Sequence, residues 1–267
     1  MLVVHLSIAI HQGRCRPIWF LSLSTPMSCN LKLGLYTSPE PNVNVREYQS
    51  RIGSVMYAML GTRPDIAFSI TKLSQYSANP GDDHWSAINR LLRYLSSTRD
   101  LKLTYDGNSK CDDESGYSDS DWAGDPRDHR SISGYVFTMA GPAVSWSSKK
   151  QPSVALSSTE GEYMAMTHAS KEAIWIQQFL HDIHFPLSDP TTLLVDNQGA
   201  IALASNPTFH ARTKHIGVRH HFIRERVEDR DILLEYVPTN DQVADVLTKA
   251  LPYDKHSVFT MDMGLHE

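Results

Sequence analysis

Apolar residues in the first third of the chain recur at a helical spacing. Between residues 48 and 60 they return at three- and four-residue steps, which is the repeat of one buried helix face. Pro64 opens a second pattern of this kind, since proline is well accommodated in the first turn of a helix. A third pattern begins at Asp82 and ends near Thr98. The sequence therefore predicts three short helices in this part of the chain.

A pattern typical of strands begins near residue 100. The segment DLKLTYDG alternates between apolar and polar side chains and ends in a turn signal. Further strand-like segments are found at 116–121, 133–139, 143–148, 191–196 and 232–238. Helical patterns are found at about 159–181, between 197 and Pro207, at 218–227 and at 241–250. This order of elements predicts a mixed α/β domain of about 150 residues.

Composition and charge narrow the classes of protein. Of 267 residues, 41% are apolar and 21% are charged, which is enough to bury a core. No apolar run reaches the ~18 residues needed to span a bilayer. The first residues lack a basic start and a small-residue cleavage site, so no export signal is predicted. The net charge of −5 argues against a histone-like binder, although it is compatible with nucleic acid bound through metal ions.

Cysteine usage is the other compositional constraint. Cys15, Cys29 and Cys111 are too few and too scattered for a disulfide framework or a zinc site. We therefore expect free thiols in a reducing compartment.

Four acidic residues lie at or near the ends of the predicted elements. They are Asp119 on the strand at 116–121, Glu162 near the start of the long helix, Asp196 closing the strand at 191–196, and Asp245 one turn into the last helix. Brought together, four carboxylates would repel one another without cations. With two divalent ions ~3.5–4 Å apart, such a cluster would activate water and stabilise a leaving oxygen in phosphodiester cleavage. Each acid alone also fits an ordinary helix-capping or solvated role, so spacing leaves both interpretations open.

Distinctive short sequences surround these acids. In chain order they are GYSDSDWAGD, RSISGYVF, WSSKKQPSVALSSTEGEYMAM, LLVDNQGAIALASNP, RTKHIGVRHHFIRE and EYVPTNDQVADVLTK. Together they resemble the ribonuclease H domain of copia-type LTR retrotransposon Pol polyproteins. Upstream, STPM, YQSRIGSVMYAMLGTRPDIAFSI and HWSAINRLLRYLSST resemble the end of the reverse transcriptase, its thumb and the connection. The resemblance covers roughly residues 22–262.

This resemblance implies a fold and a domain organisation. Residues 108–262 are expected to form a ribonuclease H-like mixed five-stranded sheet flanked by helices. Residues 22–107 are expected to be a small helical remnant of the reverse-transcriptase thumb and connection, and residues 1–21 a divergent N-terminal segment. The chain contains no Tyr-x-Asp-Asp motif, so we expect a fragment of Pol without polymerase activity.

The resemblance also implies a site and a reaction. The metal-binding catalytic acids would be Asp119, Glu162, Asp196 and Asp245, with Asp121 as an auxiliary or structural acid. The implied reaction is hydrolysis of the RNA strand of an RNA–DNA hybrid with two Mg²⁺ ions, or with Mn²⁺. The basic residues expected to contact phosphates are Lys149, Lys150, Arg212, Lys214, Arg219 and Arg224. Expected partners are the hybrid and other parts of a Pol polyprotein, with no membrane, in the cytoplasm or in virus-like particles.

Two other interpretations stay open at this point. The chain could be an inert transposon remnant that at most binds nucleic acid, an interpretation favoured by its truncation and by Gly217, where the family usually has an acidic residue. It could also be an unrelated α/β binding module, which would show no metal dependence and no preference for hybrids. The complete set of four acids favours the enzyme.

Overall fold

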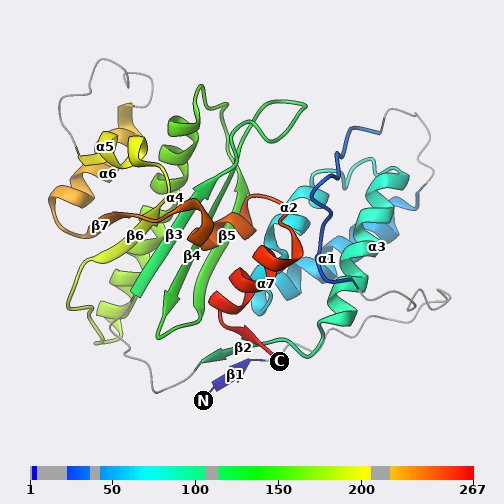
Figure 1. The fold of residues 1–267 in the computed structure, drawn as a ribbon, viewed down its shortest axis with the longest axis horizontal. Coiled ribbons are helices and arrows are strands. Elements are labelled where there is room, and N and C mark those ends of the chain that lie inside the picture. Colours follow the sequence, from blue (N-terminus) through cyan, green and yellow to red (C-terminus); the bar gives the residue numbers. More distant parts are fainter. Residues whose placement is uncertain (1, 5–22, 37–42, 106–113, 206–216) are drawn as a thin grey trace. The chain divides into compact units, whose positions relative to one another are not determined.

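The chain folds into two compact units (Figure 1). The computed structural model describes residues 2–4, 23–36, 43–105, 114–205 and 217–267, apart from the side chains of 2–4 and 217–221. Unit 1 comprises Met1–Tyr105 and Lys249–Glu267, and unit 2 comprises Asp106–Thr248. Among the described residues, no helix is both long enough and apolar enough to cross a membrane.

Unit 1 is a helical unit with one small sheet. Its helices are α1 (Val45–Gly61), the 3-10 turn η1 (Pro64–Ile66), α2 (Ala67–Ser74), α3 (Asp82–Ser97) and α7 (Tyr253–Asp262). Its antiparallel strands have the order β1 (Leu2–Val4), β2 (Lys102–Tyr105), β8 (Leu265–His266). The three helices predicted before Thr98 are confirmed, and their apolar faces share one core. Helix α1 starts early because the Asn44 side chain accepts a hydrogen bond from the Glu47 amide at 3.2 Å.

A buried ion pair connects the helices of unit 1. The Arg63 guanidinium donates to both carboxylate oxygens of Asp65, at 2.9 and 2.8 Å, and the Tyr94 hydroxyl donates to Asp65 at 2.6 Å. Burial alone raises the pKa of Asp65, but Arg63 and Tyr94 outweigh burial and hold that pKa below its usual range. A ring nitrogen of His256 on α7 lies 3.3 Å from the Asp65 carbonyl oxygen. This network joins α7 to the helices formed by the first part of the chain.

Unit 2 is built on a mixed five-stranded sheet in the order β5-β4-β3-β6-β7. The strands are β3 (Glu114–Ser120), β4 (Ile132–Met139), β5 (Ala143–Lys150), β6 (Thr191–Val195) and β7 (Ile232–Tyr236). The pairs β3–β4 and β4–β5 are antiparallel, whereas β3–β6 and β6–β7 are parallel. Each strand predicted in this part of the chain is confirmed to within a few residues. Seven of the eight residues of β4 are buried, as expected for a strand covered on both faces.

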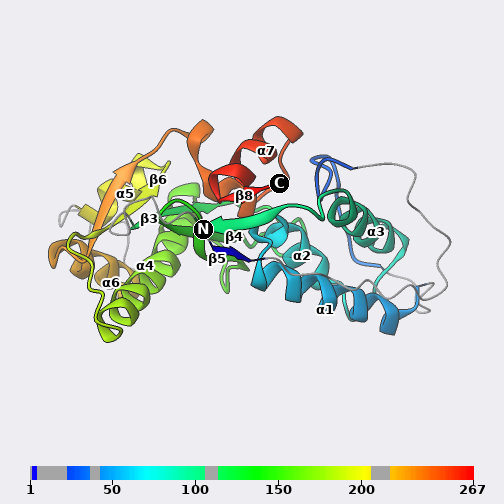
Figure 2. The ribbon, with the colours of Figure 1, turned by 90° about the horizontal axis from the view of Figure 1, so that it is seen from below.

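Helices cover one face of this sheet. The helices of unit 2 are α4 (Ser158–Asp182), α5 (Gln198–Ser205) and α6 (Gly217–Glu228). The long helix α4 packs along β3 and β4 (Figure 2), and its Tyr163 and Met166 meet Phe137 and Leu193 in the core of unit 2. The Ser157 hydroxyl accepts a hydrogen bond from the Glu160 amide at 3.2 Å, which sets the start of α4.

The end of the chain differs from the prediction. Instead of one helix over 241–250, unit 2 has two 3-10 turns, η4 (Thr239–Asp241) and η5 (Val243–Leu247), and η5 packs on β3 and β4. Helix α7 and strand β8 follow and were not predicted. They belong to unit 1, whereas the sequence had grouped residues up to 262 with the ribonuclease H-like domain. Thr248 ends η5 and Pro252 precedes α7, so the helical segment is interrupted between them.

The first residue of β3 is a buried acid at the end of the strand away from Asp119. Glu114 is 6% exposed, and burial raises the pKa of its carboxyl to about 7, although a hydrogen bond from the Thr191 hydroxyl at 2.6 Å opposes the shift. Because the folded-state pKa lies above the unfolded one, the folded state favours the protonated acid. Its contribution to stability is complete below pH ~4.5 and is lost as the pH rises toward 7.

We predict that Glu114→Gln removes this loss. The free energy of unfolding of the wild type should fall by about 3 kcal/mol between pH 4.5 and 8 on account of Glu114, since one pKa unit corresponds to about 1.4 kcal/mol. The variant should match the wild type near pH 4.5 and exceed it at pH 8, as measured by urea unfolding monitored by circular dichroism. An equal pH dependence in both proteins would contradict the assignment.

Candidate metal centre

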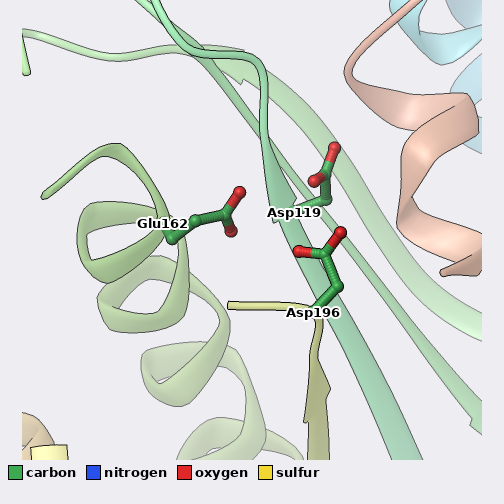
Figure 3. Close-up of side chains that lie close together, drawn as sticks. All are labelled: Asp119, Glu162 and Asp196. Carbon is green, nitrogen blue, oxygen red and sulfur yellow. The ribbon is translucent and has the colours of Figure 1, made fainter. Parts of the chain in front are cut away.

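Three of the four predicted acids meet in unit 2 (Figure 3). Asp119, Glu162 and Asp196 each offer a carboxylate oxygen, and these three oxygens lie within 4.8 Å of one another. Asp119 is 1% and Glu162 6% exposed, whereas Asp196 is partly exposed. The carboxylates come from β3, from the first turns of α4 and from the residue after β6. Asp196 is therefore the member of the cluster that is most accessible to solvent.

The parallel pairing of β3 and β6 brings the two aspartates together. Ser118 is the register partner of Val195, so Asp119 and Asp196 follow at the same level of the sheet. The carboxyl ends of parallel strands lie at one edge of a sheet, which is why both acids emerge there. Only the sheet register, and not the spacing of 77 residues, determines this proximity.

A small polar network places Glu162 at the same edge. The Ser120 amide donates to Glu162 Oε1 at 3.3 Å. The buried Gln151 amide nitrogen lies 2.9 Å from the Gly161 carbonyl oxygen, 3.2 Å from the Ser120 hydroxyl and 2.9 Å from the Ser133 hydroxyl. Gln151 thereby ties the start of α4 to the ends of β3 and β4. The sequence analysis did not identify Gln151, because its three partners are distant in sequence.

Asp196 does not cap the helix that follows it. The Asn197 side-chain oxygen accepts from the Ala200 amide at 3.0 Å, so Asn197 caps α5. Asp196 instead accepts a hydrogen bond from the Thr239 hydroxyl of η4 at 2.8 Å. Its carboxylate is thus turned toward the cluster and away from the helix.

The fourth acid, Asp245, lies on η5 and is not part of the group within 4.8 Å. It is 1% exposed, on a turn that packs against β3 and β4. On either side of it in sequence, Gln242 donates to the Ser118 carbonyl oxygen at 3.0 Å, and the Thr248 hydroxyl donates to Asp119 Oδ2. These contacts hold the turn that carries Asp245 against the strand that carries Asp119.

Asp121 has a structural contact of its own. One of its carboxylate oxygens accepts from the Ile132 amide, a residue at the start of β4. This contact closes the connection between β3 and β4. Of the two roles left open for Asp121, the contact matches the structural one.

The predicted phosphate-contacting residues have differing surroundings. Lys149 is exposed, whereas Lys150 forms ion pairs with Asp125 and, at 2.9 Å, with Asp128. Arg224 is 8% exposed, and its positive charge partly opposes the rise that burial causes in the pKa of the Tyr163 hydroxyl. Arg212, Lys214 and His215 lie outside the described residues. The side chains of Arg219, His220 and His221 are likewise not described. Of the described candidates, only Lys149 combines exposure with a position on the sheet.

The donor set defines which ions the cluster fits. Its ligands are carboxylate oxygens alone, which suit hard divalent cations such as Mg²⁺ and Mn²⁺. Oxygens bound to one Mg²⁺ at ~2.1 Å are about 3.0 Å apart as neighbours and about 4.2 Å apart across the ion. Oxygens within 4.8 Å of one another therefore need only small side-chain movements to bind one ion.

Comparisons with known proteins show which proteins the chain is similar to. The chain is 41% identical over 249 residues to the retrovirus-related Pol polyprotein from transposon TNT 1-94 of Nicotiana tabacum, an alignment covering 91% of this chain and 18% of that protein. It is also 51% identical over 131 residues to secreted RxLR effector protein 161 of Plasmopara viticola, covering 48% of this chain and 90% of that protein. No family model matches the chain.

Among solved structures, the chain is similar to LC11-RNase H1 isolated from compost. The sequence identity is 19% and the TM-score 0.37, covering 51% of this chain and 93% of the other. The strand order and strand directions, rather than this score, define the fold.

The mixed sheet β5-β4-β3-β6-β7, with α4 along one face and acids at the ends of β3 and β6, makes unit 2 a ribonuclease H-like α/β domain. Similarity at about 40% identity extends over 91% of the chain in several relatives. These relatives are Pol polyproteins of copia-type LTR retrotransposons, and the chain corresponds to a part of them that spans less than a fifth of their length.

Gly134 on β4 permits the close approach of η5. It is the register partner of Asp119, and a Cβ added to it would lie 2.8 Å from Leu247 Cβ and 2.8 Å from Thr248 Cγ2. Such distances are shorter than real contacts, so any larger residue displaces η5.

We therefore predict that Gly134→Ala destabilises the chain by about 1–3 kcal/mol through overpacking. The matched control is Gly53→Ala in the middle of α1, where no atom lies within 4 Å of the added carbon. That control should gain about 0.5–1 kcal/mol, since alanine is the better helix former. Urea unfolding followed by circular dichroism measures both. Unchanged or increased stability of Gly134→Ala would refute the steric argument.

Proposed function

We propose that this chain is a metal-dependent endonuclease that hydrolyses the RNA strand of RNA–DNA hybrids. The observation that carries the proposal is the convergence of Asp119, Glu162 and Asp196 within 4.8 Å. Carboxylates at this spacing repel one another, and two of them are buried, so a divalent cation is the natural counter-charge. The similarity to Pol polyproteins over 91% of the chain supports the same proposal.

All four acids bind metal ions in this proposal. Asp119, Glu162 and Asp196 hold metal ions, and Asp245 on η5 completes the set of ligands. When bound, two Mg²⁺ ions would lower the pKa of a water molecule and stabilise the departing 3′-oxygen. The chain itself supplies rigid oxygen donors, since α4, β3 and β6 are held together by the sheet and by Gln151.

The hybrid substrate is the finer part of the proposal. LC11-RNase H1 has been solved in complex with an RNA/DNA hybrid. For this chain, we propose that RNA is distinguished by its 2′-hydroxyls, which backbone and polar side chains contact without reading base sequence. Lys149, Arg212, Lys214 and Arg219 would bind phosphates, and the ion-paired Lys150 and the buried Arg224 would do so less.

An inert remnant is the second candidate. The observation that favours it is Gly217, where the family that the chain resembles usually has an acidic residue. Such a remnant would keep the acidic cluster as ancestry and would bind nucleic acid without cleaving it.

Cleavage of a labelled RNA–DNA hybrid in Mg²⁺ separates the two candidates. We predict cutting of the RNA strand only, and none with single-stranded RNA or duplex DNA. Asp119→Asn should lower the rate by more than ~100-fold, because loss of a metal ligand exceeds the ~10–100-fold effects of groups that merely orient ligands. Asp189→Asn, which changes an exposed carboxylate in the loop before β6, is the matched control and should cut like the wild type.

The contrary outcome is equally clear. If folded wild-type protein cuts nothing in either Mg²⁺ or Mn²⁺, the inert remnant is correct. If both the wild type and Asp119→Asn cut the hybrid at the same rate, Asp119 is not part of the active site.

A further inference from the structure

Two polar side chains at the ends of η5 bond to β3. Gln242 directly precedes η5 and donates to the Ser118 carbonyl oxygen at 3.0 Å, and Thr248 directly follows η5 and donates to the Asp119 carboxylate. The turn that carries Asp245 is therefore attached to β3 at both of its ends.

Thr248 contacts two of the four acids of the proposed metal site, the carboxylate of Asp119 and the backbone of Asp245. Its hydroxyl oxygen lies within hydrogen-bond distance of Asp119 Oδ2 and 3.2 Å from the Asp245 carbonyl oxygen. A hydroxyl has a single proton, and the charged carboxylate is the stronger acceptor. The proton is therefore donated to Asp119, and the Thr248 backbone amide, which donates to the Asp245 carbonyl oxygen at 3.2 Å, holds the threonine in its turn.

One fixed oxygen orients the whole carboxylate. With Oδ2 of Asp119 bound to Thr248, rotation about the bond to the carboxylate carbon is restricted, and the direction of Oδ1 is set. Thr248 is fully buried, so no water competes for this hydrogen bond. Its methyl group lies over Gly134, so close that a Cβ at position 134 would be 2.8 Å from Thr248 Cγ2.

We infer that Thr248 is a positioning residue for the metal site, holding Asp119 in its ligand orientation and keeping the Asp245 turn on β3. The inference rests on the proposed function and deepens it, since it assigns a residue that the four-acid motif does not contain. Thr248 touches neither substrate nor metal in this assignment and acts through Asp119.

The test compares isosteric variants in the full chain. Thr248→Val keeps the shape and removes the hydroxyl, whereas Thr248→Ser keeps the hydroxyl and removes the methyl group. The matched control is Thr167→Val on α4, which removes a buried hydroxyl that donates to the Tyr163 carbonyl oxygen at 2.8 Å. The two readouts are Mn²⁺ binding, followed by loss of the free-ion EPR signal, and hybrid cleavage as a function of Mg²⁺ concentration.

We expect Thr248→Val to weaken Mn²⁺ binding about 10–100-fold and to raise the Mg²⁺ concentration for half-maximal cleavage similarly, as is typical of groups that orient metal ligands. Thr248→Ser should restore both to within about threefold, and Thr167→Val should change neither. If Thr248→Val does not fold, Thr248→Ala removes the hydroxyl without adding bulk and replaces it. A merely structural role would lower the unfolding midpoint in both valine variants and leave metal affinity unchanged.

The outcomes separate this inference from the proposed function. If the wild type binds Mn²⁺ without cleaving hybrids, the proposed function fails, and the Mn²⁺ affinities alone decide the role of Thr248. If the wild type cleaves and Thr248→Val has the same metal dependence, the inference fails and the proposed function stands. If the wild type neither binds Mn²⁺ nor cleaves, both are overturned.

Discussion

Electrostatic repulsion among the carboxylates at the end of β3 is the constraint that the rest of unit 2 satisfies. Asp119, Glu162 and Asp196 have oxygens within 4.8 Å of one another, and two of the three are buried. Each accepts a hydrogen bond from a different element: Glu162 from the β3 backbone, Asp196 from η4, and Asp119 from the residue after η5. Neutral donors offset part of the repulsion, and a divalent cation would offset the remainder.

Small residues make this convergence sterically possible. Gly134 lies beneath η5, and Gly161 places the start of α4 where a Cβ would be 3.1 Å from the Ser120 hydroxyl. On the core side, a Cβ at Gly116 would lie 2.3 Å from the Phe137 ring. Both faces of β3 and β4 are thus packed closely enough that the acids at the strand ends have little freedom, which is the rigidity that a metal site requires.

Unit 1 obeys a different constraint, a buried charge. Asp65 is 1% exposed and is stable as an ion because Arg63 and Tyr94 both donate to it. A ring nitrogen of His256 on α7 also contacts the backbone carbonyl oxygen of Asp65. The helical segment before Thr98, which resembles a reverse-transcriptase thumb, is therefore a folded unit that incorporates the last residues of the chain.

Local patterns in the sequence predicted most of the helices and strands, and the motifs that resemble the family singled out the four acids. Helices and strands follow from the periodicity of apolar residues, and the motifs around Asp119, Glu162, Asp196 and Asp245 are contiguous, so both are visible without a fold. Tertiary structure alone decided that the segment at 241–250 forms 3-10 turns, because hydrogen bonds to β3 and the space over Gly134 select that geometry. It also decided that Thr248 and Gln151 serve the cluster and that α7 joins unit 1, since their partners lie far away in sequence.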